Sequence, residues 1–376
     1  MRLPLPIFSK PYHLRDYRFN LVLSVFALSV IGVLAVGSAK AVNQPKQMMG
    51  VAIGLIIMTI TSLIDYVWIT DFYWLIYLFS VVILGAVLVI GDNVNGATRW
   101  IDLGFTTFQP SELAKILLIL FFAKFITEHE DDINDAATLV KYAILSGIPL
   151  VLIVIEPNLS TTICTTLVLC LLIYVGGLSY RFIGTVLVIL IPVVVIFLAI
   201  VVQPNQFILK DYQQKRILAF LNPEEYASDE GYQQKNSVMA IGSGQLTGKG
   251  LNNNTTTSVK NGNFILEPQT DFIFAIIGEE LGFTGSCIVI ALLLLTVIQC
   301  IVIGTRSQNL TGKIIGCGVG GLIGFQSFIN IGVATQILPN TGVPLPFVSY
   351  GLTSLVSLYI GIGLVLNVGL QPKKYQ

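Results

Sequence analysis

One carboxylate in this chain of 376 residues stands where its surroundings can change its chemistry. Asp271 closes a long polar stretch, follows Gln269 and Thr270, and is followed directly by the apolar residues 272–277. Partial loss of water at such a boundary raises the pKa of a carboxyl group toward a value that suits a general base. The alternative is that Thr270 or Asp271 caps the helix that the apolar residues predict. On residue type alone, capping is the commoner role.

Two more ionisable residues lie inside an apolar stretch rather than beside one. Glu112 and Lys115 are three positions apart, so on a helix they share a face and can neutralise each other. Ionisable residues inside a membrane span usually face the protein interior and mark a functional site. A salt bridge that only locks this helix to its neighbours explains the pair equally well.

Positive residues that could bind an anion lie in outer polar segments of the chain. Lys249 belongs to the glycine-rich segment 242–250, in which glycines allow backbone amides to approach an anion closely. Glycine-rich loops are common, so this pattern alone is weak support for a site. The candidates for anion binding, in order, are Arg99, Lys249, and the neighbouring Lys215 and Arg216.

The composition indicates that these residues belong to a membrane protein. Hydrophobic residues make up 54% of the chain, charged residues 11%, and the mean hydropathy is +0.80. A soluble domain has about 25% charged residues, and a helix crossing the bilayer needs about 20 apolar residues. We therefore predict one all-α polytopic membrane domain over residues 1–376, with about ten spans. The spans come from the charge-free runs 19–39, 47–64, 72–91, 142–155, 157–180, 182–209, 281–305 and 314–372, the last holding two, and from about 111–128.

The distribution of lysine and arginine predicts the orientation of the spans. Predicted cytoplasmic segments hold eleven such residues, whereas the short outer loops hold only Lys40, Lys46 and Arg99. Both termini are therefore expected in the cytoplasm, and residues 203–270 form one long extracellular loop between the seventh and eighth helices. The unusual connections, at 95–100, 156–158, 203–270 and 339–347, all fall on the outer side. Outward-facing chemistry excludes direct use of cytoplasmic ATP.

The inventory of reactive residues narrows the chemistry further. His13 and His129 are both assigned to the cytoplasmic side, so proton transfer on the outer side falls to a carboxylate. The five cysteines lie in predicted spans without ligand spacing, and no nucleotide-binding motif is present. We expect no organic cofactor and no nucleic-acid partner.

Eight segments, in order along nearly the whole chain, resemble the SEDS family (shape, elongation, division and sporulation proteins). The N-terminus and overall length are more similar to its RodA members than to its FtsW members. The segments are NGATRWI (95–101), QPSELAK (109–115), EPNLST (156–161), GYQQ (231–234), GSGQLTGKG (242–250), TDFIFA (270–275), GEELG (278–282) and TGVPLPFVSYG (341–351).

The resemblance implies a ten-span peptidoglycan glycosyltransferase for cell elongation and shape, which polymerises lipid II on the outer face of the bacterial cytoplasmic membrane. It ties the position of Asp271 most directly to catalysis, which favours the general base over the cap. It links the positions of Arg99, Trp100, Glu112 and Lys115 to activity or to a central cavity. It also implies a partner, a class B penicillin-binding protein that crosslinks the new glycan.

Three segments depart from the family pattern. Gln269 stands where the family usually has histidine, and Glu156-Pro157-Asn158 stands where Gln-Pro-Asp is usual, which moves the carboxylate by two positions. Leu352 replaces a second glycine. None of these changes removes the predicted base.

The expected reaction is a single inverting displacement. The lipid-linked nascent glycan is the donor, the C4 hydroxyl of lipid II attacks its anomeric carbon, and Asp271 takes the hydroxyl proton. The departing diphosphate needs fixed cations or a divalent ion, Mg²⁺ or Mn²⁺. Gln269, Thr270, Ser349 and Trp100 complete the predicted substrate-binding set.

Two other functions stay open. A flippase or transporter of lipid-linked precursor would explain the intramembrane pair and the turn at 339–347, and a scaffold would only recruit the penicillin-binding protein.

Overall fold

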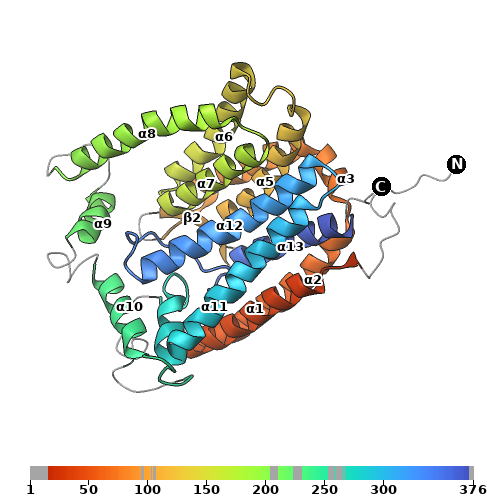
Figure 1. The fold of residues 1–376 in the computed structure, drawn as a ribbon. Helices are drawn as coiled ribbons and strands as arrows, with labels where there is room; N and C mark the ends of the chain where they lie inside the picture. The colour runs from red at the N-terminus through yellow and green to blue at the C-terminus, as the bar shows by residue number, and fades with distance from the viewer. Residues whose placement is uncertain are drawn as a thin grey trace.

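The structure, a computed structural model, describes residues 16–371 apart from 95–96, 103, 105–106, 204–210, 223–230, 253–257, 259–264 and 266. It is a bundle of long helices (Figure 1). The helices in the first half are α1 (Phe19–Ala39), α2 (Gln44–Leu63), α3 (Tyr66–Asp71), α4 (Tyr73–Ile90), α5 (Pro110–Glu128) and α6 (Ala136–Ile155), with a 3₁₀ turn η3 (Ala41–Asn43). The second half contains α7 (Leu159–Val175), α8 (Tyr180–Val201), α9 (Asp211–Leu221), α10 (Tyr232–Ser243), α11 (Ile273–Thr305), α12 (Leu310–Ala334) and α13 (Leu352–Leu370).

Seven helices in the described part of the chain are long and apolar enough to cross a membrane. They are α1, α2 with its preceding turn, α4, α6, α11, α12 and α13. Of the other long helices, α5 carries four charged residues and α7 has 17 residues. The chain is thus a multi-pass membrane protein, as predicted, and the count of ten spans stays a prediction.

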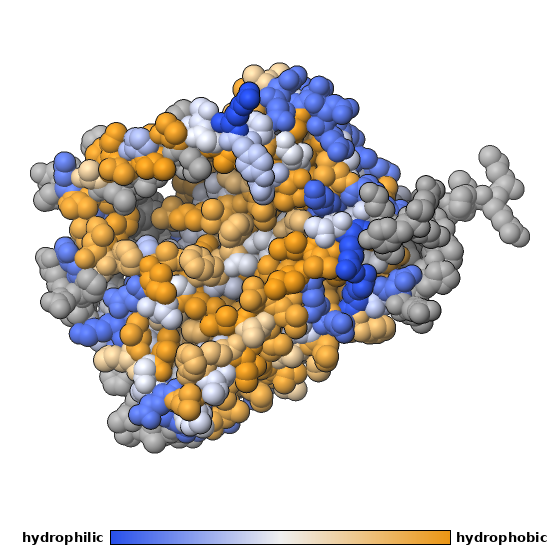
Figure 2. All heavy atoms as spheres, in the orientation of Figure 1, coloured by the Kyte–Doolittle hydropathy of each residue, from blue (hydrophilic) through white to orange (hydrophobic). Residues whose placement is uncertain are grey.

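The surface carries the same pattern as the sequence. Figure 2 shows hydrophobic side chains across the middle of the visible face and hydrophilic ones gathered toward its ends. At one end of the bundle, a Cβ atom on Gly369 would lie 3.2 Å from the side chain of Arg18, so the two ends of the described chain meet there. This agrees with termini on one side of the membrane, although residues 1–15 and 372–376 lie outside the described residues.

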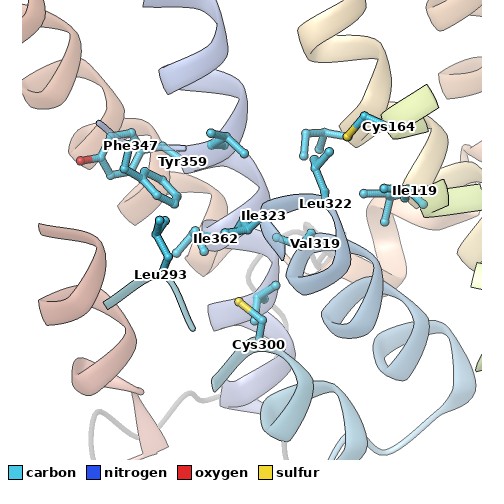
Figure 3. Packing of buried hydrophobic residues seen from close by; sticks show 14 of the residues in the cluster. Ile119, Cys164, Leu293, Cys300, Val319, Leu322, Ile323, Phe347, Tyr359 and Ile362 are labelled. Atoms are coloured by element: carbon cyan, nitrogen blue, oxygen red, sulfur yellow. The ribbon is translucent and has the colours of Figure 1, made fainter. Parts of the chain in front are cut away.

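The core is built around α12 and α13, the two most deeply buried spans. Val319, Leu322 and Ile323 of α12 lie between Ile119 and Cys164 on one side and Ile362 on the other (Figure 3). Burial on all sides requires such helices to be apolar all round rather than along one stripe. The turn before α13 joins this core through Phe347, whose ring meets Tyr359 edge-on at 5.5 Å.

The fold contains a small sheet that we did not predict. Strands β1 (Asp92–Val94), β2 (Ala97–Asp102) and β3 (Thr107–Phe108) form an antiparallel sheet between α4 and α5, in the order β1-β2-β3. These strands are two to six residues long. Hydrophobic periodicity over such short segments does not separate strand from loop. Arg99 and Trp100 both belong to β2.

The glycine-rich segment 242–250 has a use other than the one we expected. Helix α11 breaks at Gly282, where φ is 67°, and the segment bonds across the break. The amides of Lys249 and Gly250 donate to the carbonyl oxygens of Glu279 and Glu280, each at 3.0 Å. These amides therefore bind carbonyls rather than an anion. The glycines allow the approach, since a Cβ atom on Gly248 would lie 2.1 Å from the Glu280 oxygen.

Candidate functional site

Asp271 lies in the turn that leads into α11 and is half-buried. The N-cap position of α11 is Phe272, and no side-chain cap bond is made there. The hydroxyl of Thr270 donates instead to the carbonyl oxygen of Glu267 at 2.8 Å. Neither Thr270 nor Asp271 therefore occupies the N-cap position of α11, and the role of Asp271 as a base stays a prediction.

The segment 339–351 forms one wall beside Asp271. A Cβ atom on Gly342 would lie 3.0 Å from Oδ2 of Asp271, and φ at Gly342 is 73°. Only glycine meets both conditions without strain. The carboxylate therefore lies directly against the turn that the sequence singled out for its prolines.

The predicted residues Gln269, Thr270 and Ser349 lie beside Asp271, and the protein itself uses their polar groups. The hydroxyl of Ser349 accepts a hydrogen bond from the amide of Leu345 at 2.8 Å and donates to the carbonyl oxygen of Thr270 at 2.5 Å. The amide of Tyr350 donates to the carbonyl oxygen of Gln269 at 2.8 Å. These bonds join the turn to the main chain on the N-terminal side of Asp271.

Gln269 is buried at the position where the family usually has histidine. Its side-chain nitrogen donates to the carboxylate of Glu267, while its Oε1 atom has no hydrogen-bond partner among the described residues. Its role as a substrate ligand stays a prediction.

The intramembrane pair is formed as predicted. Nζ of Lys115 lies 2.8 Å from Oε1 of Glu112, and both side chains are 3% exposed. Lys115 also donates to Oε1 of Gln326 at 3.2 Å, and Nε2 of Gln326 donates to the carbonyl oxygen of Pro344 at 3.0 Å. The pair is therefore connected to the same turn that lies beside Asp271.

Arg99 of β2 joins two outer loops. Its Nε atom donates to the carbonyl oxygen of Glu156 at 3.1 Å, and its Nη2 atom donates to that of Pro157. Ser160, at the start of α7, donates to the carbonyl oxygen of Thr341. The outer segments around 99, 157, 271 and 342 thus meet at one end of the bundle, as the topology predicted.

Trp100, which is also half-buried in this sheet, is paired with Asp92 in the register of β1 and β2.

Glu156 follows α6 in an outer loop, and its side chain is completely buried. Neither carboxyl oxygen has a hydrogen-bond partner among the described residues. Burial raises the pKa of this carboxyl group from 4.5 to about 8, although the nearby charge of Arg99 lowers it in part. Asn158 stands where the Gln-Pro-Asp pattern has its aspartate. Its side chain caps α7 by accepting a hydrogen bond from the amide of Thr161 at 3.3 Å.

The long-loop cations are dispersed. Nζ of Lys249 lies 2.8 Å from Oε1 of the buried Glu279, so its charge is already compensated. Lys215 is exposed on α9, and the side chain of Arg216 lies outside the described residues. Binding of a diphosphate by these three residues stays a prediction.

Two amide side chains on α12 were missed. Asn330 donates to the carbonyl oxygens of Asp271 and Val343 at 2.8 Å and 2.6 Å, and Gln326 lies one helical turn before it. The signal was available, because both are polar residues four positions apart within the charge-free run 314–372.

Comparison with known proteins places this site in a family. A profile described as cell cycle protein, covering FtsW, RodA and SpoVE, matches residues 17–374. The chain belongs to the FtsW/RodA/SpoVE family. It is 34% identical to the peptidoglycan glycosyltransferase MrdB of Escherichia coli K12 over 355 residues, 93% of this chain and 92% of that protein. It is 32% identical to the probable peptidoglycan glycosyltransferase FtsW of Geobacter sulfurreducens over 371 residues, 95% of this chain and 96% of the relative.

Solved structures agree with the family assignment. A chain from a structure described as the structural coordination of polymerization and crosslinking by a peptidoglycan synthase complex is 28% identical, with a TM-score of 0.80 over 94% of this chain and 97% of that one. The crystal structure of Thermus thermophilus RodA, a rod shape determining protein, is 25% identical, with a TM-score of 0.69 over 94% and 96% of the two chains. The fold is thus shared from end to end.

Proposed function

We propose that this member of the family is a peptidoglycan glycosyltransferase that polymerises lipid II, with Asp271 as its general base. The C4 hydroxyl of lipid II attacks the anomeric carbon of the lipid-linked nascent glycan, and the lipid diphosphate departs from the opposite face. Asp271 removes the hydroxyl proton as the bond forms. One carboxylate is sufficient, because diphosphate leaves without protonation by a separate acid.

The placement of Asp271 carries this proposal. Its carboxylate is half-buried at the meeting point of the outer loops and lies against Gly342, in a turn held by α12. A base must lie within hydrogen-bond reach of the proton that it removes, so a fixed position matters as much as its pKa. The turn beside Asp271 is bonded to α12 through Val343 and to the start of α7 through Thr341, and the α6–α7 connection is bonded in turn to Arg99 of β2.

The developing negative charge on the diphosphate requires positive partners. Arg99 is our first candidate among the protein residues, because it is half-buried in the same cluster of loops. A divalent cation, Mg²⁺ or Mn²⁺, is proposed to accompany the diphosphate. Among the described residues, no group of three His, Cys, Asp or Glu side chains is arranged for a metal ion. Mg²⁺ is commonly held by one or two carboxylates together with substrate phosphates, and the donors present fit that mode only.

The partner and location follow from the relatives. The structure with the TM-score of 0.80 is described as a synthase complex that coordinates polymerisation with crosslinking. We propose that this chain likewise works with a class B penicillin-binding protein, in the bacterial cytoplasmic membrane, in cell elongation.

Transport of a lipid-linked precursor is the second candidate, and the break in α11 at Gly282 favours it, since broken helices occur at transporter sites. One experiment separates the two. Purified wild type and Asp271→Ala, each with and without a class B penicillin-binding protein, are incubated with lipid II and Mg²⁺, and products are resolved as a glycan ladder. We expect polymer from wild type and none from the variant. Normal polymer from Asp271→Ala would refute the assignment of the base, and no polymer from wild type with partner would favour transport.

A further inference from the structure

We propose that Asn330 of α12, supported by Gln326, is a positioning residue that fixes the main chain at Asp271 against the 339–351 turn. The inference rests on the proposed function, in which the carboxylate of Asp271 is the base. The side chain of Asn330 is 1% exposed, and its Nδ2 atom donates to the carbonyl oxygens of Asp271 at 2.8 Å and Val343 at 2.6 Å. A single amide group therefore bridges the catalytic residue and the turn.

The orientation of this amide is determined by its partners. A side-chain amide has two N–H donors, and both are used here on carbonyl oxygens, which only accept. The reverse assignment would place the amide oxygen of Asn330 against two other oxygens. Donation by the nitrogen is therefore the feature that a substitution must preserve.

Gln326 extends the same arrangement by one helical turn. It donates to the carbonyl oxygen of Pro344 at 3.0 Å, next to the carbonyl that Asn330 binds. Its own oxygen accepts from Lys115, which is paired with Glu112 at 2.8 Å. Two consecutive carbonyls of the turn are thus held from one face of α12, and one of these bonds is tied to the buried ion pair.

The same turn touches the reacting group. Gly342 lies directly before the carbonyl-bonded residues Val343 and Pro344, and it is the residue against which Oδ2 of Asp271 lies. A shift of the turn would move both the main chain of Asp271 and the wall beside its carboxylate. A displacement of about 1 Å can lower a rate about 100-fold. Loss of Asn330 is therefore expected to lower kcat and to leave KM for lipid II nearly unchanged.

A purely structural role is the alternative. Backbone carbonyls of a buried irregular segment must be satisfied, and on that account alone Asn330 would matter for folding but not for the turnover of folded protein. The test therefore compares kcat and KM for lipid II in purified protein that has a native melting temperature.

The variants are Asn330→Ala, which removes the donor, and Asn330→Asp, which keeps the shape but cannot donate twice. Ser327→Ala is the matched control, because Ser327 lies on the same helix, is 7% exposed, and has no hydrogen-bond partner in the described part of the chain. We expect kcat to fall about 10- to 100-fold in both Asn330 variants, with KM within about twofold. Ser327→Ala should retain the wild-type values.

Wild-type kcat in folded Asn330→Ala, full turnover in Asn330→Asp, or a loss confined to KM would overturn the proposal. If Asn330→Ala does not fold, Asn330→Asp carries the test, and failure of both to fold would make the residue structural. Failure of the proposed function is recognised separately, because it would show as no polymer from wild type with its partner or as normal polymer from Asp271→Ala.

Discussion

The Glu156→Gln substitution should stabilise this protein in alkaline solution and leave its stability unchanged in acid. Glu156 is completely buried, and neither carboxyl oxygen has a hydrogen-bond partner among the described residues. Burial favours the neutral form and raises the pKa from 4.5 to about 8, and the opposing effect of Arg99 is smaller. Glutamine has the shape of the neutral form and does not titrate.

The magnitude follows from linkage between proton binding and folding. The folded-state pKa is raised above the unfolded value, so the contribution of Glu156 to stability is complete below about pH 4.5 and is lost as the pH rises through about 8. At about 1.36 kcal/mol per pH unit, the loss across this window amounts to at most about 5 kcal/mol. The stability advantage of Glu156→Gln over wild type should therefore grow as the pH rises from about 4.5 to about 8.

The assay is thermal unfolding of detergent-solubilised protein, followed by intrinsic fluorescence from pH 5 to pH 9. We expect equal melting temperatures near pH 5 and an advantage of about 5 °C for Glu156→Gln at alkaline pH. Glu130→Gln, at an exposed site, controls for the loss of one carboxylate. A pH-independent difference, or a wild type that gains on the variant as the pH rises, would refute the reasoning.

Two further substitutions test the surroundings of Asp271 and the long loop. Gly342→Ala should lower polymerisation more than tenfold and stability by about 1–2 kcal/mol, because the new Cβ would lie 3.0 Å from Oδ2 of Asp271 at a φ of 73°. Gly147→Ala, which has open space around it, should match wild type in glycan-ladder and melting assays, and a fully active Gly342→Ala would contradict the proposed wall. Lys249→Met should lower the melting temperature, at a cost of about 2–3 kcal/mol, because the ion pair of Lys249 with Glu279 at 2.8 Å is lost, whereas the exposed Lys215→Met should not. An unchanged melting temperature with a raised KM for lipid II would instead make Lys249 a diphosphate ligand.

The sequence predicted the spans well where a span consists of one uninterrupted apolar run. The run 19–39 coincides with α1, and the short run 142–155 lies within α6, which begins six residues earlier, at Ala136. Helix α11 was harder to delimit, because its first turns contain the buried Glu279 and Glu280. Glu279 is compensated by Lys249, a partner 30 positions away, which no local window reveals.

The candidate site was predicted as a set of residues but not as an arrangement. Asp271, Ser349 and the Glu112–Lys115 pair were found because each breaks a local expectation for its segment. Asn330 and Gln326 were missed because the spans were delimited by charged residues, and neutral amides do not interrupt a charge-free run. What makes them informative is the identity of their acceptors, and those lie in a turn whose path only tertiary packing determines.

Burial explains why amides, rather than charges, hold this turn. A buried irregular segment has carbonyl oxygens that water does not satisfy, and here those of Val343 and Pro344 accept from α12. A lysine or arginine could donate equally well, but a buried charge would need its own counter-ion. A neutral amide fixes the main chain at Asp271 without adding a buried charge beside its carboxylate.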